Sequence, residues 1–364
     1  MFRNAFKGKR IFITGHTGFK GSWLTAWLLD LGATVAGFSV DIPTEPSHFL
    51  AMRLGDHILD IRGDIRDRET LIREMQAFKP DILFHLAAQA LVRKSYDDPA
   101  GTFEANALGT LNILEAVRKT PSIACVILIT SDKCYRNDEQ IWGYRENDAL
   151  GGTDPYSASK GCAELIAHSY FSSFFTKGPA CATVRAGNVI GGGDWACDRV
   201  VPDCARSWNQ GVSVILRNPN ATRPWQHVLE PLSGYLHLAS SLLNPLEWPD
   251  LSGQAFNFGP DASVHATVAD LVKGLALHWP GFTSTIEQKE SMRKECTLLK
   301  LCCDKALGLL DWKATLTLDE TIRETAIWYH TFYRGGCANM LETTLGQIHA
   351  YTNTAKLRSQ IWTK

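Results

Sequence analysis

The stretch IFITGHTGFKGSWL, residues 11–24, decides the fold of this 364-residue chain. Its apolar start is typical of a strand, and Gly15, Gly18 and Gly21 follow at intervals of three before a second apolar run that favours a helix. Glycines in such a turn let the backbone approach a pyrophosphate, which the N-terminus of the helix stabilises. A glycine triplet alone is weak evidence and could be a turn without a ligand. Its position between the first strand and the first helix predicts a dinucleotide-binding loop.

Short apolar runs alternate with amphipathic stretches through the first half of the chain. Strands alternating with helices predict an α/β fold with a parallel, doubly wound sheet of the Rossmann type. The expected strands cover residues 10–14, 34–39, 81–85, 125–130 and 182–185, and the expected helices cover residues 21–31, 68–77, 101–118 and 156–175.

The alternating pattern ends after Asn188, where glycine and proline divide short segments without a strand–helix–strand rhythm. We therefore expect a coenzyme-binding domain over residues 1–187. Residues 188–364 are expected to form mainly a smaller α/β lobe for the substrate, with some segments returning to the main sheet. Two late helices are expected over residues 318–333 and 341–352.

The composition is that of an ordinary globular protein. Hydrophobic residues make up 45% and charged residues 21%, and the formal net charge is −1, which gives no electrostatic reason for a nucleic-acid or membrane partner. The apolar run after Trp23 contains Asp30 and is too short to span a bilayer. The ten cysteines show no CxxC pair and no zinc-finger spacing, so we expect no metal site and reduced thiols in a cytoplasmic protein.

We assign the coenzyme's diphosphate to the glycine loop. An acidic residue about 20 positions further on should hold the adenosine ribose. Asp41 fits this role because it lies just beyond the expected strand, and since the turn has no arginine for a 2′-phosphate we expect NAD rather than NADP. The loop residues assigned are Gly15, Thr17, Gly18, Phe19 and Gly21.

Later strand ends supply further coenzyme contacts. Asp64 and Ile65 are candidates for adenine, although Asp64 could equally cap a helix. Small residues after the strand over 81–85 would let the coenzyme lie over the sheet edge, or could simply pack. Asn106 lies inside a helix that asparagine does not favour, which indicates a polar tie near the active site. The residues after the strand are Leu86, Ala87 and Ala88, followed by Gln89 as a substrate contact.

Tyr156 and Lys160 are spaced to lie on one face of a helix. Ionising an ordinary tyrosine, of pKa about 10, costs roughly 4 kcal/mol at pH 7. A neighbouring ammonium and a positive nicotinamide ring would favour the phenolate, which could then take a proton from an alcohol. Ser131 follows a buried strand and would bind the same hydroxyl. The three residues together predict a dehydrogenase-type site.

Asp132 and Lys133 offer a second acid and base, although side by side they could be an ordinary solvated ion pair. As catalysts the carboxyl must be protonated and the amine neutral, which requires each pKa to move by about 3 from its reference value. Their mutual attraction opposes this, so desolvation in a closed site would have to dominate.

These residues resemble the extended short-chain dehydrogenase/reductase family, and within it the CDP-glucose 4,6-dehydratases. The most specific mark is Ser-Asp-Lys, because dTDP-glucose dehydratases carry Thr-Asp-Glu there and epimerases lack the acid–base pair. The motifs are SDKCY (131–135), WGYREND (142–148), DPYSASKGCAE (154–164), RAGNVIGGGDW (185–195) and RPWQHV (223–228).

The resemblance implies a reaction in three stages on CDP-glucose. Tyr156 takes the 4-hydroxyl proton as the C4 hydride leaves, Lys133 removes the C5 proton while Asp132 protonates the departing 6-hydroxyl, and the hydride returns to C6. The product would be CDP-4-keto-6-deoxyglucose, a precursor of deoxysugars in bacterial surface polysaccharide such as lipopolysaccharide O-antigen.

Two positions depart from the family pattern. Cys302 stands where an aspartate is expected, which puts any pocket role there in doubt. The usual ribose-binding carboxylate falls on Ser39, which leaves Asp41 as a substitute.

Contacts to the substrate's diphosphate and base are expected from the second half of the chain. Asn188 could donate to the diphosphate, and Arg199 and Arg223 are the best local cations for phosphate. Trp225 could stack on the base, or could equally be a buried tryptophan.

Two rival functions are a nucleotide-sugar 4-epimerase, which would leave Asp132 and Lys133 idle, and a non-enzymatic dinucleotide-binding scaffold. A 4,6-dehydratase acting on another nucleotide sugar is a third. The family usually pairs the helices over residues 101–118 and 156–175 across a twofold axis, which implies a homodimer or homotetramer. The alternative is that the outer faces of these helices pack on the C-terminal helices of the same chain.

Overall fold

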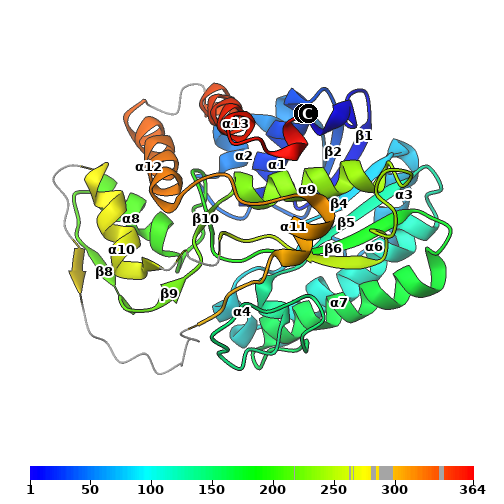
Figure 1. Ribbon diagram of the computed structural model, residues 1–364, viewed down its shortest axis with the longest axis horizontal. Coiled ribbons are helices and arrows are strands. Elements are labelled where there is room, and N and C mark those ends of the chain that lie inside the picture. Colours follow the sequence, from blue (N-terminus) through cyan, green and yellow to red (C-terminus); the bar gives the residue numbers. More distant parts are fainter. Residues whose placement is uncertain (217, 262–263, 265, 280–283, 287–297, 336–339) are drawn as a thin grey trace.

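The computed structural model describes the chain apart from residues 217, 262–263, 265, 280–283, 287–297 and 336–339. Within these residues, seven parallel strands form one sheet in the order β11-β6-β5-β4-β1-β2-β3 (Figure 1). The strands are β1 (Arg10–Thr14), β2 (Thr34–Ser39), β3 (Leu59–Arg62), β4 (Ile82–His85), β5 (Cys125–Ile129), β6 (Ala180–Arg185) and β11 (Gln254–Asn257). The predicted α/β fold with a doubly wound parallel sheet is confirmed.

Helices cover both faces of this sheet, so its central strands are buried along their whole length, as in β5. One face carries α3 (Arg68–Phe78), α6 (Gly109–Arg118) and α7 (Pro155–Phe174). The other face carries α1 (Phe19–Asp30), α9 (Leu229–Leu242) and α13 (Met340–Leu357), which lie above the sheet in Figure 1.

The strand order reverses between the neighbouring strands β1 and β4, because the chain leaves β3 at one edge and continues with β4 on the other side of β1. Strand β1 pairs with β2 on one side and with β4 on the other, and each partner is parallel to it. In open α/β sheets a ligand binds in the crevice at such a switch point, outside the carboxyl ends of the strands. The glycine loop that follows β1 lies at this crevice.

A smaller lobe lies beside the carboxyl edge of the sheet, at the left of Figure 1. Its helices are α8 (Val200–Asn209), α10 (Val268–Leu277) and α12 (Leu318–Arg334). Its short strand pairs are β7 (Val189–Ile190) with β10 (Gln226–His227), β8 (Val214–Leu216) with β13 (Ser284–Ile286), and β9 (Thr222–Arg223) with β12 (Ala266–Thr267). Later segments also join the main body, because β11 pairs with β6 and α9 packs against the sheet.

The remaining helical elements are short, apart from the run over residues 99–118 that ends in α6. They are η1 (Phe2–Asn4), α2 (His48–Ala51), η2 (Leu54–Asp56), α4 (Val92–Asp97), α5 (Pro99–Phe103), η3 (Glu104–Leu108), η4 (Asp132–Cys134), α11 (Asp304–Leu310) and η5 (Ile361–Thr363).

Among the described helices, none has both the length and the apolar character needed to cross a bilayer. The eight cysteines within the described residues are free thiols, while Cys296 and Cys337 lie outside those residues.

A buried carboxyl on α9 ties the C-terminal segments to the sheet. Glu230 accepts hydrogen bonds from the backbone N–H groups of Thr315 (2.8 Å) and Leu316 (2.6 Å) and from the Tyr351 hydroxyl (2.9 Å). Burial raises the pKa of Glu230 from its ordinary value of 4.5 to about 7. The carboxyl therefore holds its proton in the folded protein at a pH where it is ionised in the unfolded chain.

We expect Glu230 to make stability depend on pH. Because the native state binds more protons than the unfolded chain between pH 4.5 and 7, the free energy of unfolding should fall by about 3 kcal/mol as the pH rises through that interval. Urea unfolding at several pH values across this range measures how the free energy of unfolding changes with pH. Glu230→Gln should lack the part of this pH dependence that Glu230 contributes, even if the substitution also changes stability by the same amount at every pH. An unchanged slope in Glu230→Gln would assign the effect to other groups.

Candidate active site

The glycine loop fits closely against the end of β4. Gly15 has a φ of +76°, and a Cβ built on it would lie 2.6 Å from the Ala87 backbone nitrogen. A Cβ on Gly21 would overlap the Gly15 carbonyl oxygen, so glycine there lets α1 pack against the loop. Both positions need glycine for steric reasons, because the loop packs closely against the end of β4 and against the start of α1.

The loop is tied to the end of β2 by side chains. Thr17 Oγ1 donates to the Asp41 carbonyl oxygen (2.7 Å), while the Asp41 side chain is exposed beside the loop. His16 bridges Ser39 Oγ through Nδ1 (2.9 Å) and Asp60 Oδ1 through Nε2 (2.9 Å). The assignment of Asp41 to the ribose stays a prediction, and the Ser39–His16–Asp60 chain was missed from the sequence.

Asp64 has a local cation as partner. Its carboxylate accepts from Arg66 Nε (2.9 Å) and Nη2 (2.6 Å), and this contact lowers the pKa of Asp64. The cap of α3 is Asp67, which accepts from the Thr70 backbone N–H at 3.2 Å. The alternative reading of Asp64 as a helix cap is therefore wrong. Ile65 is buried beside it.

Asn106 lies in the short π-helix η3 and connects three segments. Its amide oxygen accepts from the Gln89 backbone N–H (2.8 Å), and its amide nitrogen donates to the Gln89 carbonyl (3.0 Å) and to Ser159 Oγ on α7 (2.8 Å). The predicted polar tie is confirmed. Because both amide hydrogens are used by the chain, a direct contact of this nitrogen with the coenzyme is not supported.

The Gln89 side chain is turned toward its own segment. Its amide nitrogen donates to the Leu91 carbonyl and to Thr102 Oγ1, each at 3.0 Å, and its amide oxygen accepts from the Leu91 N–H at 2.6 Å. This arrangement argues against Gln89 as a substrate contact, because its amide already fixes the turn before α4. Leu86 and Ala87 bind Thr14 through their backbone N–H groups, at 3.0 and 3.2 Å, and Ala88 follows them.

Helix α7 positions the two residues expected to act on the alcohol. Asp154 caps it by accepting from the Ser157 N–H (2.9 Å), and the helix then carries Tyr156, Lys160 and Glu164 at intervals of four. Tyr156 and Lys160 are 7% and 6% exposed, and Lys160 makes no hydrogen bond or ion pair with any described residue.

The third residue of this face fixes the helix to the sheet. Both carboxylate oxygens of Glu164 accept from Arg185 on β6, at 2.8 Å each, and both side chains are 3% exposed. Glu164 also accepts from Thr183 (2.8 Å) and from Thr130, which directly precedes Ser131. This buried bidentate pair connects the helix of Tyr156 to the strand end that carries Ser131.

Tyr156 is buried beside Ser131, which hydrogen-bonds to it. Burial raises the pKa of Tyr156 to about 12, and this hydrogen bond opposes the rise. Burial also lowers the pKa of Lys160 to about 8. The protein by itself therefore does not shift Tyr156 toward the phenolate, in contrast to the expectation from the sequence, because desolvation dominates.

Asp132 and Lys133 differ in their surroundings. Asp132 is 4% exposed, and its Oδ1 accepts from Ser131 Oγ at 2.9 Å. A Cβ built on Gly187 would overlap the Asp132 carboxylate, so the carboxylate lies directly over the Cα of that glycine. Lys133 is exposed, so the closed site in which both groups are desolvated is not present for Lys133. Its role as a base stays a prediction.

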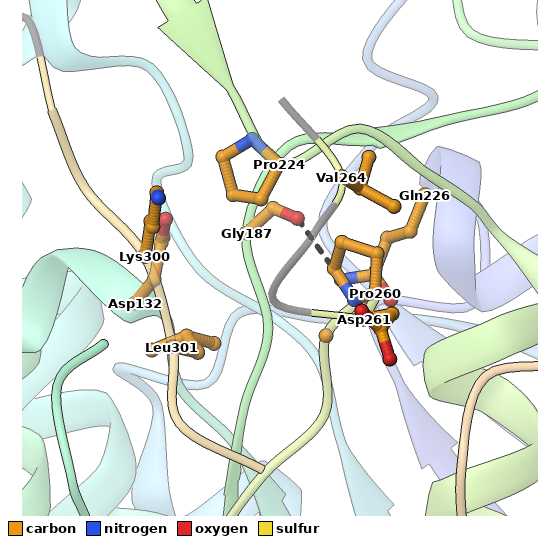
Figure 2. A pocket seen from close by; sticks show the side chains of 10 residues that line it. Asp132, Gly187, Pro224, Gln226, Pro260, Asp261, Val264, Lys300 and Leu301 are labelled. Carbon is orange, nitrogen blue, oxygen red and sulfur yellow. Dashed lines mark hydrogen bonds between the residues drawn. The ribbon is translucent and has the colours of Figure 1, made fainter. Parts of the chain in front are cut away.

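A small pocket opens at Asp132, between the carboxyl edge of the sheet and the smaller lobe. Figure 2 shows Gly187 in its centre, where the amide of Gln226 donates to the Gly187 carbonyl at 3.0 Å. The same Gln226 nitrogen donates to the Phe258 carbonyl at 3.1 Å and so fixes the pocket wall. The pocket is lined by Asp132, Gly187, Pro224, Gln226, Gly259, Pro260, Asp261, Val264, Lys300 and Leu301.

The expected diphosphate ligands come from loops around this edge. Arg199 precedes α8 and pairs with Asp194 at 2.7 Å, and the charge of Asp194 raises its pKa. Tyr156 interacts electrostatically with Arg199, which places that cation at the catalytic side of the cleft. Asn188 is partly buried with a φ of +51°, and Arg223 lies on β9.

Trp225 belongs to the hydrophobic core. It is 8% exposed, and its indole nitrogen has no hydrogen-bond partner among the described residues. These facts favour the alternative of a buried tryptophan over a base-stacking surface. The described residues also contain no group of three His, Cys, Asp or Glu side chains placed to hold a metal ion.

Two further residues of the site, besides the Ser39–His16–Asp60 chain, were missed from the sequence. Gly187 has no local signal, because only the fold brings it against Asp132. Lys20 lies in the first turn of α1 and interacts electrostatically with Asp132, Lys160 and Arg199. The sequence could have pointed to Lys20, because it places a lysine at the N-terminus of a helix, where the helix dipole disfavours positive charge.

Comparison with known proteins gives a consistent set of relatives. A family model described as GDP-mannose 4,6 dehydratase matches residues 12–325. The chain is 48% identical to CDP-glucose 4,6-dehydratase of Salmonella typhimurium over 92% of this chain and 94% of the relative. It is 27% identical to CDP-paratose 2-epimerase of Salmonella typhi over 88% of this chain and 98% of that protein.

Solved structures share the fold at lower identity. UDP-glucose 4-epimerase of Thermotoga maritima, solved with UDP-glucose, gives a TM-score of 0.76 at 21% identity and covers 88% of this chain and 99% of its own. The dTDP-glucose 4,6-dehydratase DesIV of Streptomyces venezuelae, solved with NAD, gives a TM-score of 0.73 at 21% identity over 91% and 99% of the two chains.

Proposed function

Because the chain belongs to the GDP-mannose 4,6-dehydratase family, we propose that it is an NAD-dependent enzyme that dehydrates CDP-glucose to CDP-4-keto-6-deoxyglucose. The observation that carries the proposal is the meeting of Ser131, Asp132 and Tyr156, all buried, at the carboxyl end of the sheet. The choice of CDP-glucose is supported by the 48% identity to a CDP-glucose 4,6-dehydratase along nearly the whole chain.

The residues around the glycine loop fit a dinucleotide. The loop leads directly into the N-terminus of α1, which favours the negative charge of a diphosphate. Lys160 is a buried cation that makes no hydrogen bond or close ion pair with the residues that the structure describes, and ribose hydroxyls would give its ammonium acceptors. When bound there, NAD supplies an acceptor for the substrate's C4 hydride and later a donor. We assign it to the glycine loop, with Asp41 at the ribose and Asp64 at the adenine.

In the first stage Tyr156 takes the proton of the 4-hydroxyl while the C4–H bond breaks. Ser131 holds the substrate oxygen and the phenol together, since it already hydrogen-bonds to Tyr156. Because burial raises the pKa of Tyr156 to about 12, positive charge near the ring is required to make it an effective base. The charge of Arg199 meets part of that requirement.

In the second stage the new ketone acidifies the C5 hydrogen. Lys133 removes that proton, the C6–O bond breaks, and Asp132 protonates the departing hydroxide so that water leaves. Asp132 is buried beside Ser131 at the carboxyl end of the sheet, which is the position required of a group that meets the departing hydroxide. Lys133 is exposed in the protein alone, so this stage requires the substrate to cover it.

One incubation separates this proposal from a 4-epimerase and from a non-enzymatic binder. The protein is given CDP-glucose in deuterated water, and the product is analysed by NMR and mass spectrometry. We expect a 4-keto-6-deoxy sugar with solvent deuterium at C5. A C4 epimer without exchange would identify an epimerase, and unchanged CDP-glucose would contradict catalysis on this substrate. Parallel incubations with GDP-mannose and dTDP-glucose test the nucleotide preference.

Lys133→Met should separate the two stages. The variant is expected to oxidise C4 but to lose deuterium incorporation at C5 by at least about 100-fold, because a methionine of similar length has no base. Lys177→Met, at an exposed lysine before β6 on the opposite edge of the sheet, is the matched control. Exchange at the wild-type rate in Lys133→Met would remove Lys133 from this role.

We further propose that the enzyme is a homodimer or homotetramer in the cytoplasm and supplies deoxysugars for surface polysaccharide. The helices expected to pair carry large exposed apolar side chains, namely Leu108 (52%) before α6 and Leu165 (61%) and Phe174 (51%) on α7. A twofold contact along these helices would bury them. Sedimentation measurements on the purified protein test the oligomeric state.

A further inference from the structure

The ammonium group of Lys20 occupies an electrostatically unfavourable position unless an anion binds beside it. It is the second residue of α1, whose first turn contains no acidic side chain. The N-terminus of a helix carries partial positive charge, so a lysine in the first turn is disfavoured there and an anion is favoured. Lys20 is partly buried and makes no hydrogen bond or ion pair with any described residue.

The groups that face Lys20 come from three other elements. Asp132 at the start of η4 attracts it, while Arg199 before α8 and Lys160 on α7 repel it. Arg199 is already paired with Asp194. Lys160, like Lys20, makes no hydrogen bond or close ion pair with any described residue, although Glu164 attracts it electrostatically. Three cations therefore converge on one cleft, and Asp132 is the carboxylate that attracts Lys20 there.

Burial lowers the pKa of Lys20 to about 8, and the charges of Arg199 and Lys160 act in the same direction. At neutral pH the ammonium is still charged, although no side chain in the described part of the chain forms a hydrogen bond or close ion pair with it. A ligand that brings negative charge would relieve both the lost hydration and the repulsion between the cations. A neutral sugar would relieve neither of them fully.

We propose that Lys20 is a diphosphate ligand, and that with Arg199 it forms a cationic clamp reaching from the glycine loop across the cleft. The proposal rests on the proposed function, which brings two diphosphates to this cleft, one in the coenzyme and one in the nucleotide sugar. Both present the same chemistry, an oxygen-rich dianion, so either of them would supply the negative charge that Lys20 lacks. From the sequence, contacts to the substrate's diphosphate were expected only in the second half of the chain.

The test measures two dissociation constants by calorimetry for Lys20→Met, Lys20→Arg and the control Lys177→Met. One titration uses NAD alone, and the other uses CDP on protein saturated with NAD. Loss of a charge-assisted contact should weaken one of the two ligands about 10- to 100-fold in Lys20→Met, with Lys20→Arg within a few-fold of wild type. The weakened ligand identifies the diphosphate that Lys20 binds.

A pH series adds a readout that a structural role would not change. Affinity of the wild type for the weakened ligand should fall as the pH rises through about 8, because Lys20 loses its charge there. Lys20→Arg should keep its affinity over the same interval, since arginine stays charged. Lys160 titrates equally in both proteins, so the difference between them isolates Lys20.

Two results would overturn the proposal. One is a Lys20→Met variant whose affinities for NAD and CDP both stay within twofold of wild type. The other is a Lys20→Arg variant with the wild-type pH dependence. If instead the wild type makes no ketosugar from CDP-glucose, the proposed function fails, while the NAD titration still decides whether Lys20 binds a diphosphate.

Discussion

Replacement of Tyr156 with phenylalanine should lower kcat on CDP-glucose by about 10²- to 10⁴-fold, because the substitution removes the group that takes the 4-hydroxyl proton. The ring can stay where it is, since Tyr156 is buried on α7 and phenylalanine has the same shape without the oxygen. Binding of CDP should therefore change much less than kcat. Steady-state kinetics with calorimetric titrations separate the two effects.

A tyrosine on the same helix provides the control for this prediction. Tyr170 Oη donates to Glu115 at 2.8 Å, far along α7 from Ser131, so Tyr170→Phe should leave kcat close to wild type. The wild-type rate should also fall as the pH is lowered, because the base must be free of its proton. A Tyr156→Phe variant with near-normal turnover would place the base elsewhere.

Replacement of Gly187 with alanine should block dehydration while C4 oxidation continues. An added Cβ would overlap the Asp132 carboxylate, which must then move from its place beside Ser131. Misplacing a reacting group by about 1 Å can cost about 100-fold in rate. We therefore expect release of the ketosugar to slow by about 100-fold, with reduced coenzyme accumulating because the hydride is taken from C4 and cannot return.

Two companion variants make this result specific. Asp132→Asn removes the acid directly and should give the same accumulation of reduced coenzyme. Gly308→Ala adds a Cβ into open space on α11 and should leave both stages unchanged. If Gly187→Ala released ketosugar at the wild-type rate, the carboxylate of Asp132 would not be needed where the structure places it.

The sequence predicts the elements of the Rossmann half well, because their apolar runs are local. The strands over residues 10–14 and 34–39 match β1 and β2 residue for residue. Helix α9 was missed because all of its residues are buried, which removes the polar face that a helical period requires. Strand β3 was missed because it is short and only partly buried, so it lacks an apolar run.

The candidate site likewise contains residues that a local sequence pattern predicts and residues that only the fold brings together. Tyr156 and Lys160 follow from spacing within one helix, and the Gly15 turn follows from its place after a strand. The contact of Gly187 with Asp132 joins residues far apart in sequence, so no local pattern contains it.

The weaker assignments from the sequence share one physical cause. Gln89 and Trp225 were read by residue type as substrate contacts, but hydrogen bonding within the chain engages the first and burial covers the second. Residue type states what a side chain can bind, whereas the fold decides which of its partners are already present.

The central claim is that a hydride leaves C4 of the sugar and returns at C6 of the same molecule. A mixture of CDP-glucose deuterated at C4 and unlabelled CDP-glucose tests it most directly, with the product analysed by mass spectrometry and NMR. The account predicts that every labelled substrate yields a product with deuterium at C6 and that no label passes to unlabelled molecules. A ketosugar without deuterium at C6, or label exchanged between molecules, would contradict the account.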